Sequence, residues 1–145
     1  IKKKYVYILS FLIMIALFMT IFRWNDYREK KLVDVLDGEE IEKILFNEPP
    51  FDEEIAFNRT VSDQDSIEEF VNFLKQYKVK KVGTRNFSSK YPNEQFSFQL
   101  EYTDERLTYP TLLERDTVLA EHDQYIVTNG PIDYKWIEDF RDKHE

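Results

Sequence analysis

The 145-residue chain has no cysteine, only three glycines and only two histidines. Without cysteine there is no disulfide, no thiol nucleophile, no cysteine-ligated zinc and no lipid-modified cysteine to hold the chain to a membrane. So few glycines leave no glycine-rich loop that would cradle a phosphate. The G-x-S-x-G and H-E-x-x-H patterns of hydrolases and zinc proteases are absent as well. The sequence therefore excludes several catalytic classes and offers no diagnostic motif in their place.

A long uncharged run stands near the beginning of the chain, from Tyr5 to Phe22. As an α-helix, its eighteen residues would span about 27 Å, close to the ~30 Å hydrocarbon core of a bilayer. With the preceding lysines, it predicts a basic tail and a transmembrane signal anchor over residues 1–22. Two alternatives stay open, a cleaved signal peptide and a buried core helix. The bulky residues around Phe22 favour the uncleaved anchor, because a cleavage site needs small side chains.

The basic residues on the two sides of this run are nearly balanced in number. Three lysines precede it, and Arg23, Arg28, Lys30 and Lys31 follow it within one short segment. A short basic tail stays in the cytoplasm more readily than a whole domain does. We therefore expect a single-pass protein of the cell membrane, with a cytoplasmic N-terminus and an extracytoplasmic C-terminal domain.

Acidic residues dominate the chain after the apolar run. From residue 25 onward there are 16 lysines and arginines against 28 aspartates and glutamates, a net charge of −12. Nucleic acids and anionic lipids bind basic surfaces, so we expect both to repel this part of the chain and expect no nucleic-acid partner. The one basic cluster, at 75–85, would suit an acidic partner, but lysines at a helix C-terminus explain it more simply.

Hydrophobic periodicity after the run predicts an α+β fold. We expect a helical stalk over 23–37 and then an acidic extracytoplasmic domain over 38–145, in which helices pack on one face of an antiparallel sheet. The predicted order in this domain is β-β-α-β-meander-α. Its expected elements are strands at 39–46 and 55–61, a helix at 62–77 capped by Ser62 or Asp65, a strand from Val79 to Gly83, a polar loop at 84–94, a meander from Phe96 to Thr128, and a helix from Ile132 to Phe140.

The clearest strand runs through residues 96–102, where apolar and polar side chains strictly alternate. Its apolar members are expected in the core, and Leu107, Tyr109 and Leu113 are expected to continue the same core face after a turn. Its polar members form a candidate interaction face on the other side of the sheet, although for this strand alone a solvated sheet face explains them somewhat better. This candidate face consists of Ser97, Gln99, Glu101 and Thr103.

For the other candidate sites, a structural explanation of the residues is stronger than a functional one. The segment from Asp63 begins like a calcium loop, but Leu74 stands where the last ligand should be a glutamate, so acids at a helix start explain it better. His122 and His144 have no patterned partner that would indicate a metal site. The acidic run 52–54 resembles paired catalytic carboxylates, yet such runs arise readily in an acidic chain. We therefore expect no cofactor, no metal site and no catalytic residues.

In its layout of basic tail, anchor, stalk and one small α+β domain, the chain resembles the small signal-anchored envelope proteins of low-GC Gram-positive bacteria. The resemblance rests on no motif and implies no functional residue. Together these observations favour a non-catalytic accessory, sensory or immunity-type domain that binds another envelope protein. A carboxylate-based hydrolase of the envelope and a structural subunit of a membrane complex are the alternatives.

Overall fold

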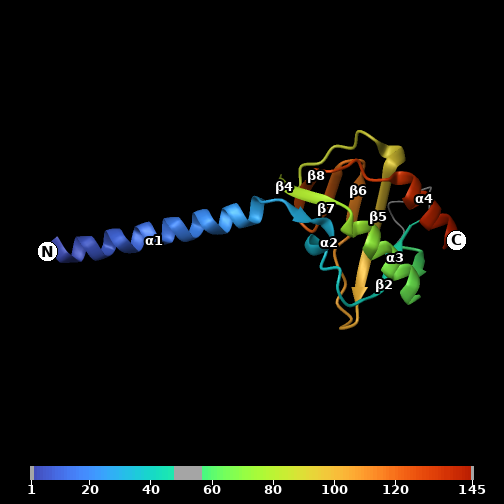
Figure 1. The fold of residues 1–145 in the computed structure, drawn as a ribbon, viewed down its shortest axis with the longest axis horizontal. Helices are drawn as coiled ribbons and strands as arrows, with labels where there is room; N and C mark the ends of the chain where they lie inside the picture. Colours follow the sequence, from blue (N-terminus) through green and yellow to red (C-terminus); the bar gives the residue numbers. More distant parts are fainter. Residues whose placement is uncertain (1, 48–56, 145) are drawn as a thin grey trace.

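A computed structural model describes residues 2–47 and 57–144 of the chain. The helix α1 (Lys2–Tyr27) projects as a long rod from an α+β body that contains an eight-stranded antiparallel sheet (Figure 1). The predicted α+β class is therefore confirmed. Within the described residues, α1 is the one helix that is long and apolar enough to cross a membrane, and its span is not buried against the rest of the chain.

The sheet forms most of the body. Its strand order is β1-β4-β8-β7-β6-β5-β2-β3, and β5 to β8 make a continuous meander in its centre. The elements after α1 are β1 (Lys30–Lys31), α2 (Leu32–Val35), β2 (Ile41–Phe46), β3 (Arg59–Val61), α3 (Gln64–Lys75), β4 (Lys78–Thr84), the 3-10 turn η1 (Pro92–Glu94), β5 (Gln95–Tyr102), β6 (Thr111–Glu114), β7 (Thr117–Ala120), β8 (Asp123–Val127) and α4 (Tyr134–Lys143). Part of the strand predicted at 55–61 lies outside the described residues.

The core lies between one face of the sheet and the helices α3 and α4. Phe70 of α3 packs its ring 5.1 Å from the ring of Phe98 on β5 and 5.4 Å from that of Phe140 on α4. The apolar members of β5 are at most 2 % exposed, as their alternation predicts. The N-cap of α3 is Asp63, whose carboxylate accepts a hydrogen bond from Ser66 N at 2.9 Å, rather than Ser62 or Asp65.

The predicted helical stalk over 23–37 is wrong in its second half. The helix α1 ends at Tyr27, and the chain then pairs β1 with β4, with Lys30 opposite Val79. The backbone amide of Leu32 donates to Tyr77 O at 2.9 Å, and Leu32 itself is fully buried. Residues after Tyr27 fold into the body because their apolar side chains are stabilised more by burial in the core than they would be on an isolated helix.

The predicted core face after β5 is also wrong in part. Leu113 is 1 % exposed, but Leu107 is 50 % and Tyr109 is 62 % exposed. A turn with Glu105 at a φ of 64° leads the chain away from regular pairing, which is limited there to a single bridge between Glu101 and Leu107. The alternation of core and solvent positions is lost in such an irregular segment, so these two side chains stay at the surface.

The segment 85–91 covers part of the second face of the sheet. At its start, Asn86 N donates to Gln124 Oε1 of β8 at 3.3 Å. At its end, the backbone amides of Lys90 and Tyr91 both donate to Glu114 Oε1 of β6 at 2.7 Å. The predicted polar loop thus crosses from β8 to β6, and the face opposite the helices is open to solvent only in part.

Candidate functional site

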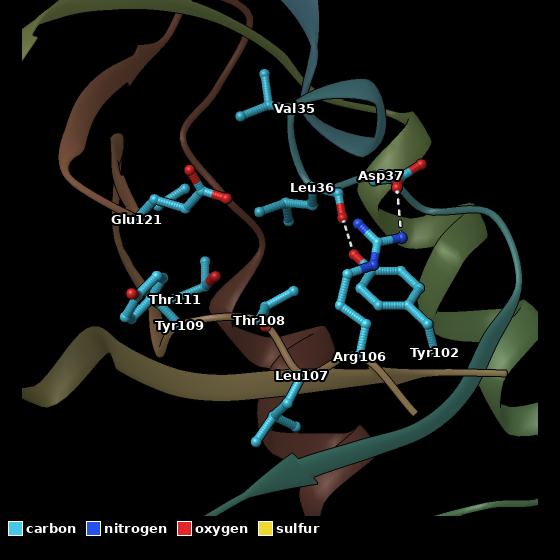
Figure 2. A pocket seen from close by; sticks show the side chains of 11 residues that line it. Val35, Leu36, Asp37, Tyr102, Arg106, Leu107, Thr108, Tyr109, Thr111 and Glu121 are labelled. Atoms are coloured by element: carbon cyan, nitrogen blue, oxygen red, sulfur yellow. Dashed lines mark hydrogen bonds and ion pairs between the residues drawn. The ribbon is translucent and has the colours of Figure 1, made fainter. Parts of the chain in front are cut away.

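A cavity of about 140 Å³ lies on the helix side of the sheet, at the end of the body where α2 meets the ends of β5 and β7. Its walls come from four segments, the first of which is distant in sequence from the other three (Figure 2). They are the end of α2, the end of β5 with the irregular segment after it, the start of β6, and the turn between β7 and β8. The lining residues are Val35, Leu36, Asp37, Tyr102, Arg106, Leu107, Thr108, Tyr109, Thr111, Ala120 and Glu121.

The walls are shaped by turns in which non-glycine residues adopt left-handed backbone conformations. Asp37 follows the C-cap of α2 at a φ of 51°, Glu105 turns the chain after β5 at 64°, and Glu121 joins β7 to β8 at 53°. Such conformations carry a cost for residues other than glycine, and they gather at binding and active sites more often than elsewhere. Three of the five described residues of this kind lie in the turns around this cavity.

The floor of the cavity is held by a buried tyrosine. Tyr102 is 2 % exposed, and its hydroxyl donates a hydrogen bond to Leu36 O at 2.5 Å, which fastens α2 to β5 (Figure 2). Burial raises the pKa of Tyr102 to about 12, and the nearby Asp37 carboxylate acts in the same direction. The phenol therefore stays neutral at every physiological pH, so it fixes the wall and does not serve as a base.

One side of the rim is a charged pair. Arg106 Nη2 lies 3.2 Å from Asp37 Oδ2, and its guanidinium stacks 4.4 Å above the ring of Tyr102. The hydrogen bond to Asp37 raises the pKa of Arg106 above its ordinary value. These contacts fix the planar guanidinium over the cavity wall, where its remaining N–H groups can donate to a ligand.

The rest of the rim is formed by Tyr109 and by Leu107, whose side chain points away from Leu36 and Thr108 (Figure 2). Tyr109 and Leu107 are 62 % and 50 % exposed, and the ring of Tyr109 lies 5.5 Å from the ring of His122. Outside α1, Tyr109 is the most exposed large hydrophobic residue that the structure describes. An exposed aromatic and an exposed aliphatic side chain beside a cavity are typical of a surface that a partner covers.

The acidic groups at the cavity do not form a catalytic pair. Asp37 is already bound to Arg106, and Glu121 lies on the opposite side (Figure 2). Hydrolysis by paired carboxylates needs two such groups converging on one reacting bond. Nor does any group of three histidine, cysteine or acidic side chains among residues 2–47 and 57–144 have an arrangement that would hold a metal ion.

The predicted interaction face lies away from this cavity, on the second face of the sheet. Ser97, Gln99 and Glu101 are half-buried there, and Thr103 follows β5 as an exposed residue. Gln99 Nε2 donates to Thr108 O at 2.8 Å, and Glu101 accepts a hydrogen bond from Lys43 Nζ at 2.6 Å. Two of the four side chains are therefore engaged within the chain. That this face binds a partner stays a prediction.

The other sequence candidates have structural roles or lie elsewhere. Asp63 caps α3, and its hydrogen bonds with Ser66 lower the pKa of its carboxyl group. His144 packs its ring 4.7 Å from Phe140 at the end of α4. The acidic run 52–54 lies outside the described residues. Sequence reasoning missed the cavity because its walls meet only in the folded chain. The one local signal was the turn Asp104-Glu105, which interrupts the alternation before Leu107.

Comparison of the chain with protein-family models, with curated proteins and with solved structures gave no match.

Proposed function

We propose that this protein is a membrane-anchored, extracytoplasmic domain that binds another envelope protein and does not itself catalyse a reaction. The observation that carries this proposal is the cavity with Leu107 and Tyr109 exposed at its rim. The apolar helix α1 supports the anchor by its length and composition. In this account, the body is held at the outer surface of the membrane and offers the cavity to a neighbouring protein.

The size of the cavity suits one side chain of a partner. A cavity of about 150 Å³ accommodates a benzene ring, and this one measures about 140 Å³. Its walls combine Leu36 and Ala120 with Thr108 and Thr111. An aromatic or branched aliphatic side chain fits this lining, and a single buried anchor of this type often supplies much of the affinity of an interface.

The rim would seal and orient such an anchor. Tyr109 can cover its apolar surface, the exposed Leu107 can contact the partner beside it, and Arg106 can donate to a carbonyl or carboxylate of the partner. The net charge of −12 after residue 24 favours a partner with basic residues around the inserted side chain. Because both proteins would share one membrane, their local concentration is high and weak binding suffices.

The hydrolase alternative lacks a comparable observation. Asp37 is paired with Arg106, and burial raises the pKa of Tyr102 to about 12, far above the range of a general base at neutral pH. Glu121 is exposed, and the other acidic residue that Figure 2 labels, Asp37, lies on the opposite side of the cavity. We therefore assign these groups to the shaping of a binding surface.

The proposal is tested by capture experiments on the solubilised full-length protein, at low and high salt. Leu107→Asp should reduce capture of the partner at least roughly tenfold, the loss that truncating an interface anchor produces. The matched control is Tyr91→Asp, which changes an exposed aromatic residue outside the cavity. A second variant, Gln99→Lys with Glu101→Lys, tests the second face of the sheet.

Each outcome has a distinct meaning. Equal capture by the Leu107 variant and the unmodified protein would exclude the cavity as the binding site. Loss of capture in the Gln99 and Glu101 variant alone would assign the interface to the second face. Turnover of a substrate by the purified protein would contradict the non-catalytic assignment.

A further inference from the structure

Basic residues are concentrated where α1 joins the sheet. The segments 23–31 and 78–85 hold eight of the chain's 20 basic residues but only two of its 28 acidic ones. The pairing of β1 with β4 brings these two segments side by side, with Lys31 opposite Lys78. Outside these two segments, the chain after residue 24 has nine basic against 26 acidic residues. Basic and acidic residues are therefore separated in the domain, although its net charge is acidic.

Several of these basic groups are already neutralised. Lys81 lies between Asp26 and Asp123, at 2.8 and 3.0 Å, and Lys78 lies 3.7 Å from Glu29. Lys30 is also 3.8 Å from Asp26. The other five are exposed and have no acidic partner among the described residues. One of them, Arg23, belongs to α1; the remaining four, Arg28, Lys31, Lys80 and Arg85, we call the basic edge.

The basic edge lies at the level of lipid headgroups if α1 spans a bilayer. Asp26 follows Phe22 by four residues, which is about 6 Å along a helix, and the headgroup layer on each side of a bilayer is about 5–7 Å thick. The bond from Asp26 to Lys81 thus places β4 close to the end of α1, near the expected membrane surface. Figure 1 shows β4 and β8 nearest to α1, with α3 and α4 at the far end of the body.

Apolar side chains accompany the basic edge. Val82 lies in the bulge of β4 and is 53 % exposed, while Ile126 of β8 pairs with Lys80 and is 42 % exposed. Trp24, in the last turns of α1, is 71 % exposed. Aromatic, aliphatic and basic side chains in this combination are typical of protein surfaces that lie in the membrane interface.

From this arrangement we propose that the basic edge binds the phosphates of anionic lipids and lays β4 and β8 against the membrane surface. This inference rests on the proposed membrane anchor and goes beyond it, because an anchor alone leaves the body free to tilt. Anionic headgroups would attract the edge, while the strongly acidic remainder of the body is repelled by the same membrane. The two effects together orient the body, with α3 and α4 pointing outward.

The test uses the full-length protein in vesicles of phosphatidylcholine, with or without phosphatidylglycerol. Since the chain has no cysteine, Val82→Cys provides a single site for a fluorophore, and nitroxide on the lipid headgroups quenches it at short range. The test variant is Lys31→Gln with Lys80→Gln. Its matched control is Lys90→Gln with Lys135→Gln, which removes the same charge outside the two segments.

We expect stronger quenching in the anionic vesicles, and we expect high salt to abolish the difference. The test variant should lower the ratio of molecules whose body lies against the membrane to molecules whose body is free of it, by about fivefold for each lysine removed. The control variant should leave this ratio unchanged. Equal quenching in both lipids, or an unchanged result in the test variant, would overturn the proposal and leave the anchor intact. Failure of the protein to float with either vesicle would overturn the anchor and this inference together.

Discussion

Lys81 Nζ donates a hydrogen bond to Asp26 Oδ2 at 2.8 Å, and so joins the last turn of α1 to the strand β4. The ammonium group also lies 3.0 Å from Asp123 on β8, and the lysine side chain is only 14 % exposed. Together with the pairing of β1 and β4, this contact makes the apolar helix and the sheet one continuous structure. The body is thus mounted on α1 in a defined orientation.

Removal of this lysine should loosen the junction. Lys81→Met leaves Asp26 and Asp123 without their shared cation and should lower the free energy of unfolding by about 1 kcal/mol, since water screens the partly exposed Asp26. Lys90→Met is the control, because Lys90 makes no ion pair with the described residues. Urea denaturation in detergent measures both, and equal stability of the two variants would show that the junction does not depend on Lys81.

The ion pair between Lys81 and Asp26 should make the free energy of unfolding depend on pH in a defined way. The hydrogen bond to Asp26 raises the pKa of Lys81, so the contribution of this lysine is complete below the ordinary lysine pKa of about 10.4 and is lost as the pH rises above it. The hydrogen bond from Lys81 lowers the pKa of Asp26, so its contribution is lost as the pH falls below about 3.9. The stability difference between the unmodified protein and Lys81→Met should therefore be constant from about pH 5 to 9 and shrink outside that range. A difference that varies within this range would contradict the assignment.

Glu114 should control the segment that covers the second face of the sheet. This residue is 2 % exposed and accepts hydrogen bonds from two backbone amides and from Gln95. Glu114→Ala removes every acceptor and should cost about 2–3 kcal/mol. Glu114→Gln keeps an acceptor for the amides of Lys90 and Tyr91 and should cost less. Hydrogen exchange of these two amides checks the prediction, and equal exchange in both variants would contradict it.

Lowering the pH should release the segment 85–91 from the second face of the sheet. Burial alone would raise the pKa of Glu114, but the hydrogen bonds from Gln95, Tyr91 and Lys90 outweigh burial and lower it. The stabilisation from this carboxylate is therefore complete above the ordinary glutamate pKa of about 4.3 and is lost as the pH falls through the lowered value. Glu114→Gln should remove this acid-sensitive part of the stability curve, and its persistence in the variant would assign it to another group.

The core should depend on the contact between α3 and β5. Phe70 and Phe98 are fully buried with their rings 5.1 Å apart, so replacing either with alanine should cost roughly 3–5 kcal/mol. Val82→Ala, at an exposed position, should change stability by less than about 0.5 kcal/mol. Chemical denaturation that finds all three variants alike would refute the assigned core face.

The sidedness of the protein can be tested in intact protoplasts. Added protease should digest the body and remove a C-terminal tag, because we expect the domain outside the cytoplasm. The transmembrane fragment should remain with the membrane and keep its apolar run. Full protection of the tag would reverse the orientation, and a mature N-terminus beyond Phe22 would show that the run is cleaved.

Local patterns predicted the elements that depend on local contacts. The alternation in β5 and the helical spacing of Phe70, Phe73 and Leu74 each reflect one face turned toward a single core. The path after Tyr27 could not be predicted in this way, because β1 is stabilised by pairing with β4, which is remote in sequence. An isolated stripe of apolar residues looks the same whether it lies on a stalk or is buried in a core.

The cavity was beyond local prediction for a related reason. Leu107 and Tyr109 continue the apolar alternation in sequence, but the turn at Glu105 breaks the register on which that reasoning depends. Asp37 and Arg106 meet where Tyr102 fastens the end of α2 to the end of β5. A site whose walls come from four separate segments becomes visible only in the folded chain.

The most direct test of the proposed function is site-specific photo-cross-linking in intact cells. A photoreactive amino acid at Leu107 should form an adduct with one envelope protein, whereas the same group at Tyr91 should not. Ala120→Leu, which fills the cavity without disturbing its rim, should abolish the adduct while the protein remains folded. Adduct formation at Leu107 that is unaffected by Ala120→Leu, or identical adducts from both positions, would contradict binding through this cavity.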